Sequence, residues 1–172
     1  MRTSQTSLPG VLVLETDEHA DARGSVREVY RGDRFEPAVT FVQDNVAISV
    51  RGALRGLHYR TAPQAKLVMV VEGAIYDVAL DVRRDSPTYG RHVAVELSAD
   101  NRRQLFIPAG FAHGYQALSE RAVVVYKLSA PFDPADDRAV RWDDPALAIT
   151  WPLAQPILSA RDATAPLLSE QP

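Results

Sequence analysis

Short apolar runs, each bounded by turn-forming residues, make up most of this chain. Residues 40–50 read TFVQDNVAISV, and their partial alternation before a glycine is typical of a strand with one buried face. Residues 122–130 read AVVVYKLSA, a second strand pattern that ends at Pro131 and Pro134. Since no long stretch has a 3.6-residue period, the pattern predicts short strands and few helices.

The middle of the chain carries further apolar runs. Residues 66–83 contain two β-rich runs around Glu72 and Gly73, which predicts a hairpin. A turn cluster, DSPTYGRH, occupies residues 85–92, and the runs VAVEL and RQLFIPAGFAHGYQAL follow it. Several of these runs are apolar on both faces, so we expect strands that are covered on both sides.

Turn signals recur at the short spacing of a β-sandwich or barrel. The proline-rich segment after residue 140 predicts one short helical turn at residues 145–148. There is no internal repeat, low-complexity tract or sign of a second domain. We therefore expect one all-β domain over residues 1–172.

Composition and charge narrow the possible functions. The 172 residues are 46% hydrophobic, enough for a sizeable core, and the net charge of −3 argues against a general nucleic-acid binder. The chain has no cysteine, which excludes disulfides, thiolate nucleophiles and cysteine-based metal sites. The first apolar run is too short for a signal peptide, and no segment reads as a membrane span, so we expect a cytoplasmic protein that does not contact the membrane.

Cationic side chains gather in residues 51–66, RGALRGLHYRTAPQAK, just before a strongly apolar run. Arg55, His58 and Lys66 belong to this segment. Such a cluster either coats a solvated turn or binds an anionic ligand. Its residues alone do not decide between the two.

The histidines bear on a possible metal site. His113 ends a Pro-x-Gly-x-x-His turn that resembles the second motif of the cupin superfamily, a β-barrel jelly roll. Metal-binding cupins usually supply two histidines and a carboxylate from their first motif, where this chain reads GLHYR with only His58. A divalent transition metal would lack ligands there, so we expect no metal. His19 and His92 are interpreted as ordinary core or surface residues.

Further motifs follow one another in a fixed order between residues 21 and 166. In chain order they read DARG, RGALRGLHY, QAK, V-x-G-x-x-x-DV, D-x-R-x-x-SPT-x-G, IPAGFAHG, WDDP and LSARDATAP. Together they resemble the dTDP-4-dehydrorhamnose 3,5-epimerase family, the RmlC-like cupins. The resemblance covers nearly the whole chain, and the joint order of the motifs is more specific than any one of them.

The resemblance implies a fold, a reaction and an assembly. The fold would be a cupin jelly-roll β-sandwich or barrel with short helical segments near the C-terminus. It would comprise an N-terminal strand arm at about residues 1–50, a core at about 51–140 and a tail at about 141–172. The family inverts carbons next to the ketone of a dTDP-4-keto-6-deoxy sugar without a cofactor. It usually forms a homodimer in which N-terminal strands are exchanged.

The resemblance also assigns catalytic roles that suit the chemistry. A proton next to a ketone is weakly acidic, so its removal needs a placed base and stabilisation of the enolate oxygen. His58 matches the family's base, and Asp162, in LSARD, matches the aspartate that orients it. Lys66 matches the cation near the ketone oxygen, and Tyr126 matches the acid on the opposite face.

Other positions match the family's substrate-binding residues. Arg55 is expected to contact the diphosphate through its planar fork, and Arg23 matches a second phosphate arginine that reaches the partner's site. Gln43 and Asn45 match positions near the nucleotide and sugar, and His113 matches a second pocket histidine. On this reading the cationic segment forms an anion-binding pocket with the base inside it.

Some positions depart from the family pattern. Phe132 stands where many members have a second tyrosine. Phenylalanine keeps the aromatic face that can stack on the base but lacks the hydroxyl. Asp137 replaces a frequent glutamate, and Val26 stands where phenylalanine is common, while Glu28 keeps a nearby carboxylate. These departures bear on which nucleotide sugar is bound. They leave the residues matched to the family's acid and base unchanged.

Several functions stay open at this point. The first is an epimerase that inverts both C3 and C5. The second is a mono-epimerase of a deoxysugar antibiotic pathway, with a 3,4-ketoisomerase as a more distant enzyme. The third is a non-catalytic nucleotide-sugar binding cupin, which would not need His58 opposed by Tyr126.

Overall fold

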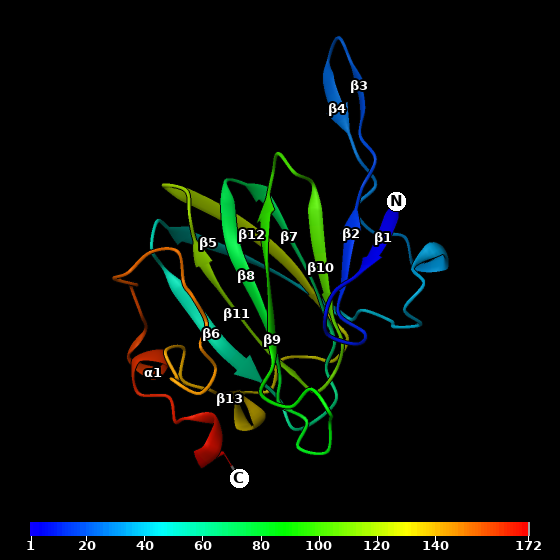
Figure 1. Cartoon of the computed structure of the whole chain (residues 1–172). Coiled ribbons are helices and arrows are strands. Elements are labelled where there is room, and N and C mark those ends of the chain that lie inside the picture. The colour runs from blue at the N-terminus through cyan, green and yellow to red at the C-terminus, as the bar shows by residue number, and fades with distance from the viewer. Residues whose placement is uncertain (172) are drawn as a thin grey trace.

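Two antiparallel sheets lie face to face in the computed structural model, which describes residues 1–171 (Figure 1). The six-stranded sheet has the order β1 (Arg2–Gln5), β2 (Leu12–Glu15), β10 (Arg103–Ile107), β7 (Lys66–Glu72), β12 (Arg121–Leu128) and β5 (Gln43–Val50). The five-stranded sheet has the order β13 (Arg138–Ala139), β6 (Leu54–Tyr59), β11 (Phe111–Ala117), β8 (Ala74–Asp81) and β9 (His92–Ser98). The predicted all-β sandwich is confirmed.

Alternation along the strands fills the space between the sheets. On β12, Ala122 and Val124 are fully buried, whereas Val123 and Val125 between them are only half-buried. Strand β11 is buried along its whole length, as the two-sided apolar pattern predicted. The core between the sheets also contains Leu8, Val11, Val68, Val70, Ile75, Leu97, Leu105 and Ile107.

The predicted hairpin at residues 66–83 is wrong. Strand β7 lies in the six-stranded sheet and β8 in the five-stranded sheet, so the chain crosses between sheets at Gly73. Gly73 has φ +75°, and a Cβ there would lie 2.2 Å from the carbonyl oxygen of Arg121. A glycine is required at this corner between sheets, just as it would be in a hairpin turn. The local sequence therefore does not distinguish a crossing between sheets from a hairpin.

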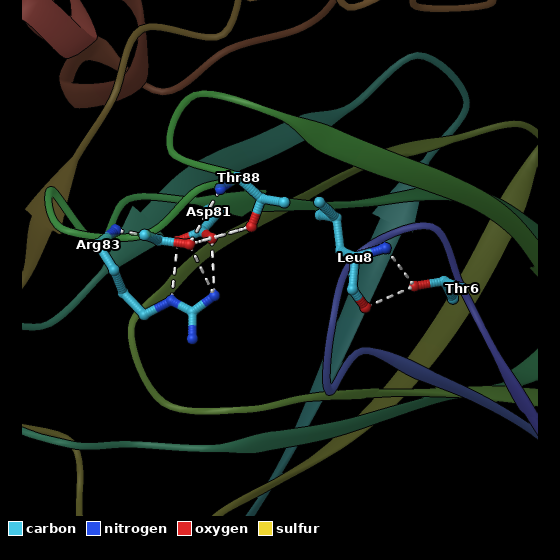
Figure 2. Close-up of polar contacts among 6 residues, drawn as sticks. Thr6, Leu8, Asp81, Arg83 and Thr88 are labelled. Atoms are coloured by element: carbon cyan, nitrogen blue, oxygen red, sulfur yellow. Dashed lines mark hydrogen bonds and ion pairs between the residues drawn. The ribbon is translucent and has the colours of Figure 1, made fainter.

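The predicted turn cluster at residues 85–92 is confirmed, and a buried carboxylate organises it (Figure 2). Asp81 accepts hydrogen bonds from Arg83 at 2.9 and 2.7 Å, from Ser86 at 2.6 Å and from Thr88 at 2.6 Å. Burial raises the pKa of Asp81, but these bonds outweigh it and hold the pKa well below its ordinary value. The D-x-R-x-x-SPT-x-G motif therefore fastens the β8–β9 loop.

A smaller polar turn joins the first two strands. Figure 2 shows Thr6 beside Leu8: the hydroxyl of Thr6 accepts a hydrogen bond from the amide of Leu8 at 3.2 Å. Strands β1 and β2 then pair with each other, and β2 pairs with β10 of the main sheet. Beyond them a two-stranded hairpin, β3 (His19–Asp21) and β4 (Gly24–Val26), projects from the sandwich (Figure 1).

Helical segments are short. They are η1 (Gly32–Arg34), η2 (Pro134–Asp136), α1 (Ala160–Ala163) and η3 (Leu168–Glu170). Short helical segments near the C-terminus are thus confirmed, but the helical turn predicted at residues 145–148 is wrong. There the amide of Leu147 donates to the carbonyl of Asp144 at 3.0 Å in a simple turn, and Ala148 has φ +49°, which a right-handed helix does not allow.

The tail runs back along the five-stranded sheet. The amide of Leu54 donates a hydrogen bond to the carbonyl of Ile157 at 3.0 Å. The amide of Ile157 in turn donates to the carbonyl of Gly52 at 2.9 Å. These bonds bring α1 beside β6 (Figure 1). In residues 1–171 no helix has the length and apolar character to span a membrane. The cytoplasmic location and the division into arm, core and tail stay predictions.

Candidate active site

A cavity of about 510 Å³ opens beside strands β5, β6, β11 and β12 and the tail. A smaller hollow of about 100 Å³ adjoins it. His58, Lys66 and Tyr126 line both, so they lie where the two meet. The larger cavity is also lined by Ala47, Ser49, Arg55, His113, Tyr115, Ser159, Arg161 and Asp162. The cationic segment therefore faces a cavity and does not merely coat a solvated turn.

Two glycines let the strands that carry the histidines approach closely. A Cβ on Gly56 would lie 2.4 Å from the Cα of Gly114, far inside contact distance. Gly56 also has φ +132°, a conformation that side chains disfavour. This close approach of β6 and β11 places His58 directly opposite His113 in the strand register.

His58 pairs with a carboxylate that comes from the tail. Its Nε2 lies 2.6 Å from Oδ1 of Asp162, across 104 residues of sequence. Ser159 caps α1 by accepting a hydrogen bond from the amide of Asp162 at 3.1 Å, which fixes the carboxylate. Burial raises the pKa of Asp162, but the bonds from His58 and Ser159 outweigh it, so the pKa is lowered and the group stays ionised. The ionised carboxylate orients the ring and leaves its Nδ1 as the nitrogen that can accept a proton.

His113 has a carboxylate partner of its own, Asp77 on β8. The His113 Nε2 lies 2.7 Å from Asp77 Oδ1, and both side chains are buried. Burial lowers the pKa of His113, and Asp77 opposes this shift only in part. His113 is therefore neutral at pH 7.

Lys66 lies at the start of β7, next to His58. Its Nζ is 3.4 Å from the backbone carbonyl of His58, and the side chain lines both hollows. Burial lowers the pKa of Lys66 to about 8, against the attraction of Asp137 and Asp77. At pH 7 this ammonium is still charged. Lys66 is therefore a buried cation that water hydrates poorly.

The smaller hollow collects the predicted nucleotide-side residues. The side-chain amide of Gln43 donates to Asn45 Oδ1 at 3.0 Å, and its oxygen accepts from the amide of Phe132 at 2.8 Å. Phe132 is 52% exposed and lines the hollow with Asn45 and Asp137. Asp137 forms an ion pair with Arg161 of the tail. This hollow thus joins the exposed face of Phe132 to the cavity that His58 lines.

The family model for dTDP-4-dehydrorhamnose 3,5-epimerase matches residues 5–170. This chain belongs to that family. It is 46% identical over 173 residues to the dTDP-4-dehydrorhamnose 3,5-epimerase of Salmonella typhimurium, covering 96% of this chain and 94% of the relative. It is 40% identical to the dTDP-4-dehydrorhamnose 3-epimerase of Streptomyces niveus, over 99% of this chain and 85% of the relative.

Solved structures of the epimerase family have the same fold. The RmlC epimerase of Legionella pneumophila, in complex with dTDP-4-keto-L-rhamnose, superposes with a TM-score of 0.95 at 41% identity, covering 98% of this chain and 93% of that chain. NovW, a 4-keto-6-deoxy sugar epimerase of Streptomyces spheroides, gives 0.95 at 39% identity, with 99% and 88% covered. The predicted cupin fold is confirmed.

Two predicted binding residues of this epimerase-family chain lie away from the cavity. Arg23, at the tip of the β3–β4 hairpin, has its side chain 90% exposed and pairs with Asp21 at 2.6 Å. Glu28 is also exposed, 3.8 Å from Arg31. Neither lines the cavity or the smaller hollow, and the hairpin that carries Arg23 projects away from the sandwich (Figure 1).

The sequence reasoning missed several residues at the site. Asp77 is an isolated carboxylate inside the apolar run AIYDVALD, and a charged residue in such a run signals a buried partner. Ser49 shares the alternating face of Asn45 and could have been found from the period of two. Tyr115 had no local signal beyond its place two residues after His113. In the part of the chain that the structure describes, no three His, Asp or Glu side chains gather as metal ligands would.

Proposed function

We propose that this chain inverts C3 and C5 of dTDP-4-keto-6-deoxy-D-glucose, with its own side chains as acid and base. The observation that carries the proposal is the His58–Asp162 pair at 2.6 Å, whose histidine lines the junction of two hollows together with Lys66 and Tyr126. Binding alone would not require an oriented base beside a buried cation and a phenol. Family membership supports the same reaction.

The first step is removal of a proton from carbon next to the ketone. His58 accepts this proton, and the carboxylate of Asp162 stabilises the imidazolium that forms. The electron pair of the C–H bond moves into an enolate whose oxygen bears the charge. Lys66 stabilises that oxygen more strongly than water would, because its ammonium is buried and already in place.

The second step returns a proton to the same carbon from the opposite face. Tyr126 on β12 lines the cavity with His58 of β6, so the two side chains come from different sheets of the sandwich. The phenol donates its proton to the enolate carbon and the ketone re-forms with inverted configuration. His58 then releases its proton to solvent, and water restores Tyr126. Both C3 and C5 flank the ketone, so one acid–base set serves both.

The remaining lining residues bind the nucleotide diphosphate. Arg55 offers a planar fork to phosphate oxygens, and His113, whose Nε2 donates to Asp77, accepts a hydrogen bond from a sugar hydroxyl at Nδ1. Phe132 provides a stacking face for the base beside Gln43 and Asn45. Asp137 holds the tail over the site through Arg161.

An uncovered apolar face supports a homodimer. Val46, Ile48 and Val50 on β5 and Val71 on β7 are 65, 57, 58 and 46% exposed on the outer face of the six-stranded sheet. Contiguous exposed apolar side chains of this kind mark interaction surfaces. Ion pairs border the face, as rims of interfaces usually do: Lys127 with Asp44, and Arg121 with Glu72.

The exchanged element would be the β3–β4 hairpin, because β1 and β2 already pair within the chain's own sheet. Val26 on the hairpin is 74% exposed, and Arg23 at its tip would reach the partner's diphosphate site. Mixing inactive Arg23→Ala and His58→Ala proteins tests this directly. Exchange in trans would restore activity in mixed dimers, whereas no recovery would contradict it.

A single-carbon epimerase is the second candidate. The Streptomyces niveus relative is named a 3-epimerase, and a structure similar to this chain, with a TM-score of 0.91 at 40% identity, is ChmJ, a 3'-monoepimerase of Streptomyces bikiniensis. The site described above suits either outcome. The choice depends on whether the bound sugar presents both carbons to His58.

Deuterium uptake tests the proposal. The protein is incubated with dTDP-4-keto-6-deoxy-D-glucose in heavy water, the ketone is trapped by reduction, and the label is located by mass spectrometry and NMR. Label with inversion at C3 and C5 is the expected result. Label at one carbon would establish the mono-epimerase, and no label would contradict both and leave a binding protein.

A further inference from the structure

The hydroxyl of Ser49 joins three strands at the wall of the cavity. Ser49 lies on β5, and Arg55 of β6 donates a hydrogen bond from Nε to its Oγ at 3.1 Å. The same Oγ lies 3.0 Å from the hydroxyl of Tyr115 on β11. Ser49 and Tyr115 are each 3% exposed, so this polar contact is enclosed by the two sheets.

These contacts hold the guanidinium of Arg55 at two points. Besides the Ser49 bond, Nη2 donates to the backbone carbonyl of Ile48 at 3.2 Å. Two donors from adjacent corners of a planar group fix its plane, and the N–H groups on Nη1 remain for a ligand. Within residues 1–171 no carboxylate lies within ion-pairing distance of Arg55, so an anion would meet an uncompensated cation.

We propose that Ser49 and Tyr115 are positioning residues, which hold Arg55 in the orientation that binds the diphosphate. This inference rests on the proposed function, because it takes the diphosphate as the anionic group of the ligand. Without the Ser49 hydroxyl, Arg55 keeps only the Ile48 bond, and one bond no longer fixes the plane of the guanidinium. The diphosphate must then order that side chain on binding, which weakens affinity.

The effect falls on binding and leaves proton transfer unchanged. Ser49 and Tyr115 have no hydrogen bond to His58, Lys66 or Tyr126 in the described residues. Loss of the hydroxyl should therefore raise KM while kcat stays nearly constant. It should also affect ligands that carry a diphosphate and spare those that do not.

The test uses Ser49→Ala with dTDP and thymidine as probes. We expect dTDP to bind about tenfold more weakly by calorimetry, and thymidine binding, followed by NMR titration, to stay within about twofold. Tyr115→Phe removes the second support and should weaken dTDP by about threefold. Ser49→Cys keeps the volume with a poor hydrogen-bond acceptor and should behave like Ser49→Ala, which covers the case in which alanine impairs folding.

Controls separate this inference from its alternatives. Ser98→Ala removes another buried hydroxyl, on β9, which accepts a hydrogen bond from Asn101 at 3.0 Å, and it should leave dTDP binding unchanged. Equal weakening of dTDP and thymidine in the Ser49 variants would indicate a merely structural role and overturn the inference. Wild-type dTDP affinity in the Ser49 variants, with weak binding in Arg55→Ala, would also overturn it. If the wild-type protein does not bind dTDP at all, the proposed function itself fails.

Discussion

The two histidine–aspartate pairs of this chain have nearly equal distances and different surroundings. His58 and Asp162 are 2.6 Å apart, and the histidine side chain is 29% exposed to the cavity. His113 and Asp77 are 2.7 Å apart, and that histidine is only 9% exposed. A histidine transfers protons only where substrate and solvent reach it. Access, and not the hydrogen bond to aspartate, therefore separates the proposed base from a group that stays neutral.

The two pairs also differ in origin. Asp77 lies on a strand next to that of His113, within the core of the five-stranded sheet. Asp162 comes from a four-residue helix at the end of the chain and reaches β6 through the tail. A carboxylate carried by the tail is positioned by how the tail docks, while a carboxylate on a strand is positioned by the sheet. The tail therefore completes the proposed catalytic pair, which the sandwich supplies only in part.

Loss of the base should have the largest effect. His58→Ala is expected to lower kcat by about 10³–10⁴-fold and to abolish deuterium exchange next to the ketone. The matched change at the buried pair, His113→Ala, should leave exchange measurable. Exchange at the wild-type rate in His58→Ala would remove His58 as the base.

Removal of the Asp162 charge, which orients His58, should have the second-largest effect on kcat. Asp162→Asn keeps the shape but no longer stabilises the imidazolium, so we expect kcat to fall about 10²–10³-fold with little change in KM. Steady-state kinetics on the trapped product would measure it. A loss no greater than that of Asp77→Asn would contradict the difference drawn between the pairs.

Removal of the acid should separate the two steps. Tyr126→Phe is expected to retain proton abstraction by His58 and to lower formation of the inverted product about 10²-fold. NMR in heavy water reports both quantities in one sample. Unimpaired inversion would show that another group donates the proton.

The pH profile should report the ionisation of Lys66, which lines the cavity with both histidines. Because its pKa is lowered to about 8 by burial, the ammonium loses its proton as pH rises through 8, earlier than an exposed lysine would. We expect kcat to fall above that pH. Lys66→Arg, whose side chain stays charged, should remove this alkaline limb, and an unchanged limb in that variant would assign it to another group.

The smallest expected effect concerns Asp77. Its negative charge raises the pKa of Lys66 against burial, so Asp77→Asn should shift the alkaline limb to lower pH. At pH 7 we expect kcat to stay within about tenfold of wild type. A limb that does not move would mean that Asp77 serves only to hold His113.

The strands were predictable from the sequence where the pattern is local. Alternation in residues 40–50 and 122–130 follows from one face packing on the core, and the structure has strands β5 and β12 there. The partner of each strand was not predictable in this way. Gly73 is needed at a corner between sheets for the same reason it would be needed in a hairpin, so the hairpin prediction failed.

The site was predictable only in part. The motif resemblance pointed to His58, Lys66, Tyr126 and Asp162, and the structure brings all of them to one cavity. It gave no indication of Ser49 or Tyr115, whose importance lies in a contact between strands of different sheets. Side-chain contacts across the sandwich have no local signature.

The sequence by itself determined the all-β class and the family, and it nominated the residues proposed to move protons, because alternation and motif order are properties of the chain. The tertiary structure alone decided how far each histidine is exposed, that Asp77 pairs with His113, and that the hairpin bearing Arg23 projects from the sandwich. These depend on burial and on distances between segments far apart in sequence. Such quantities arise only when the two sheets pack and the tail docks beside β6.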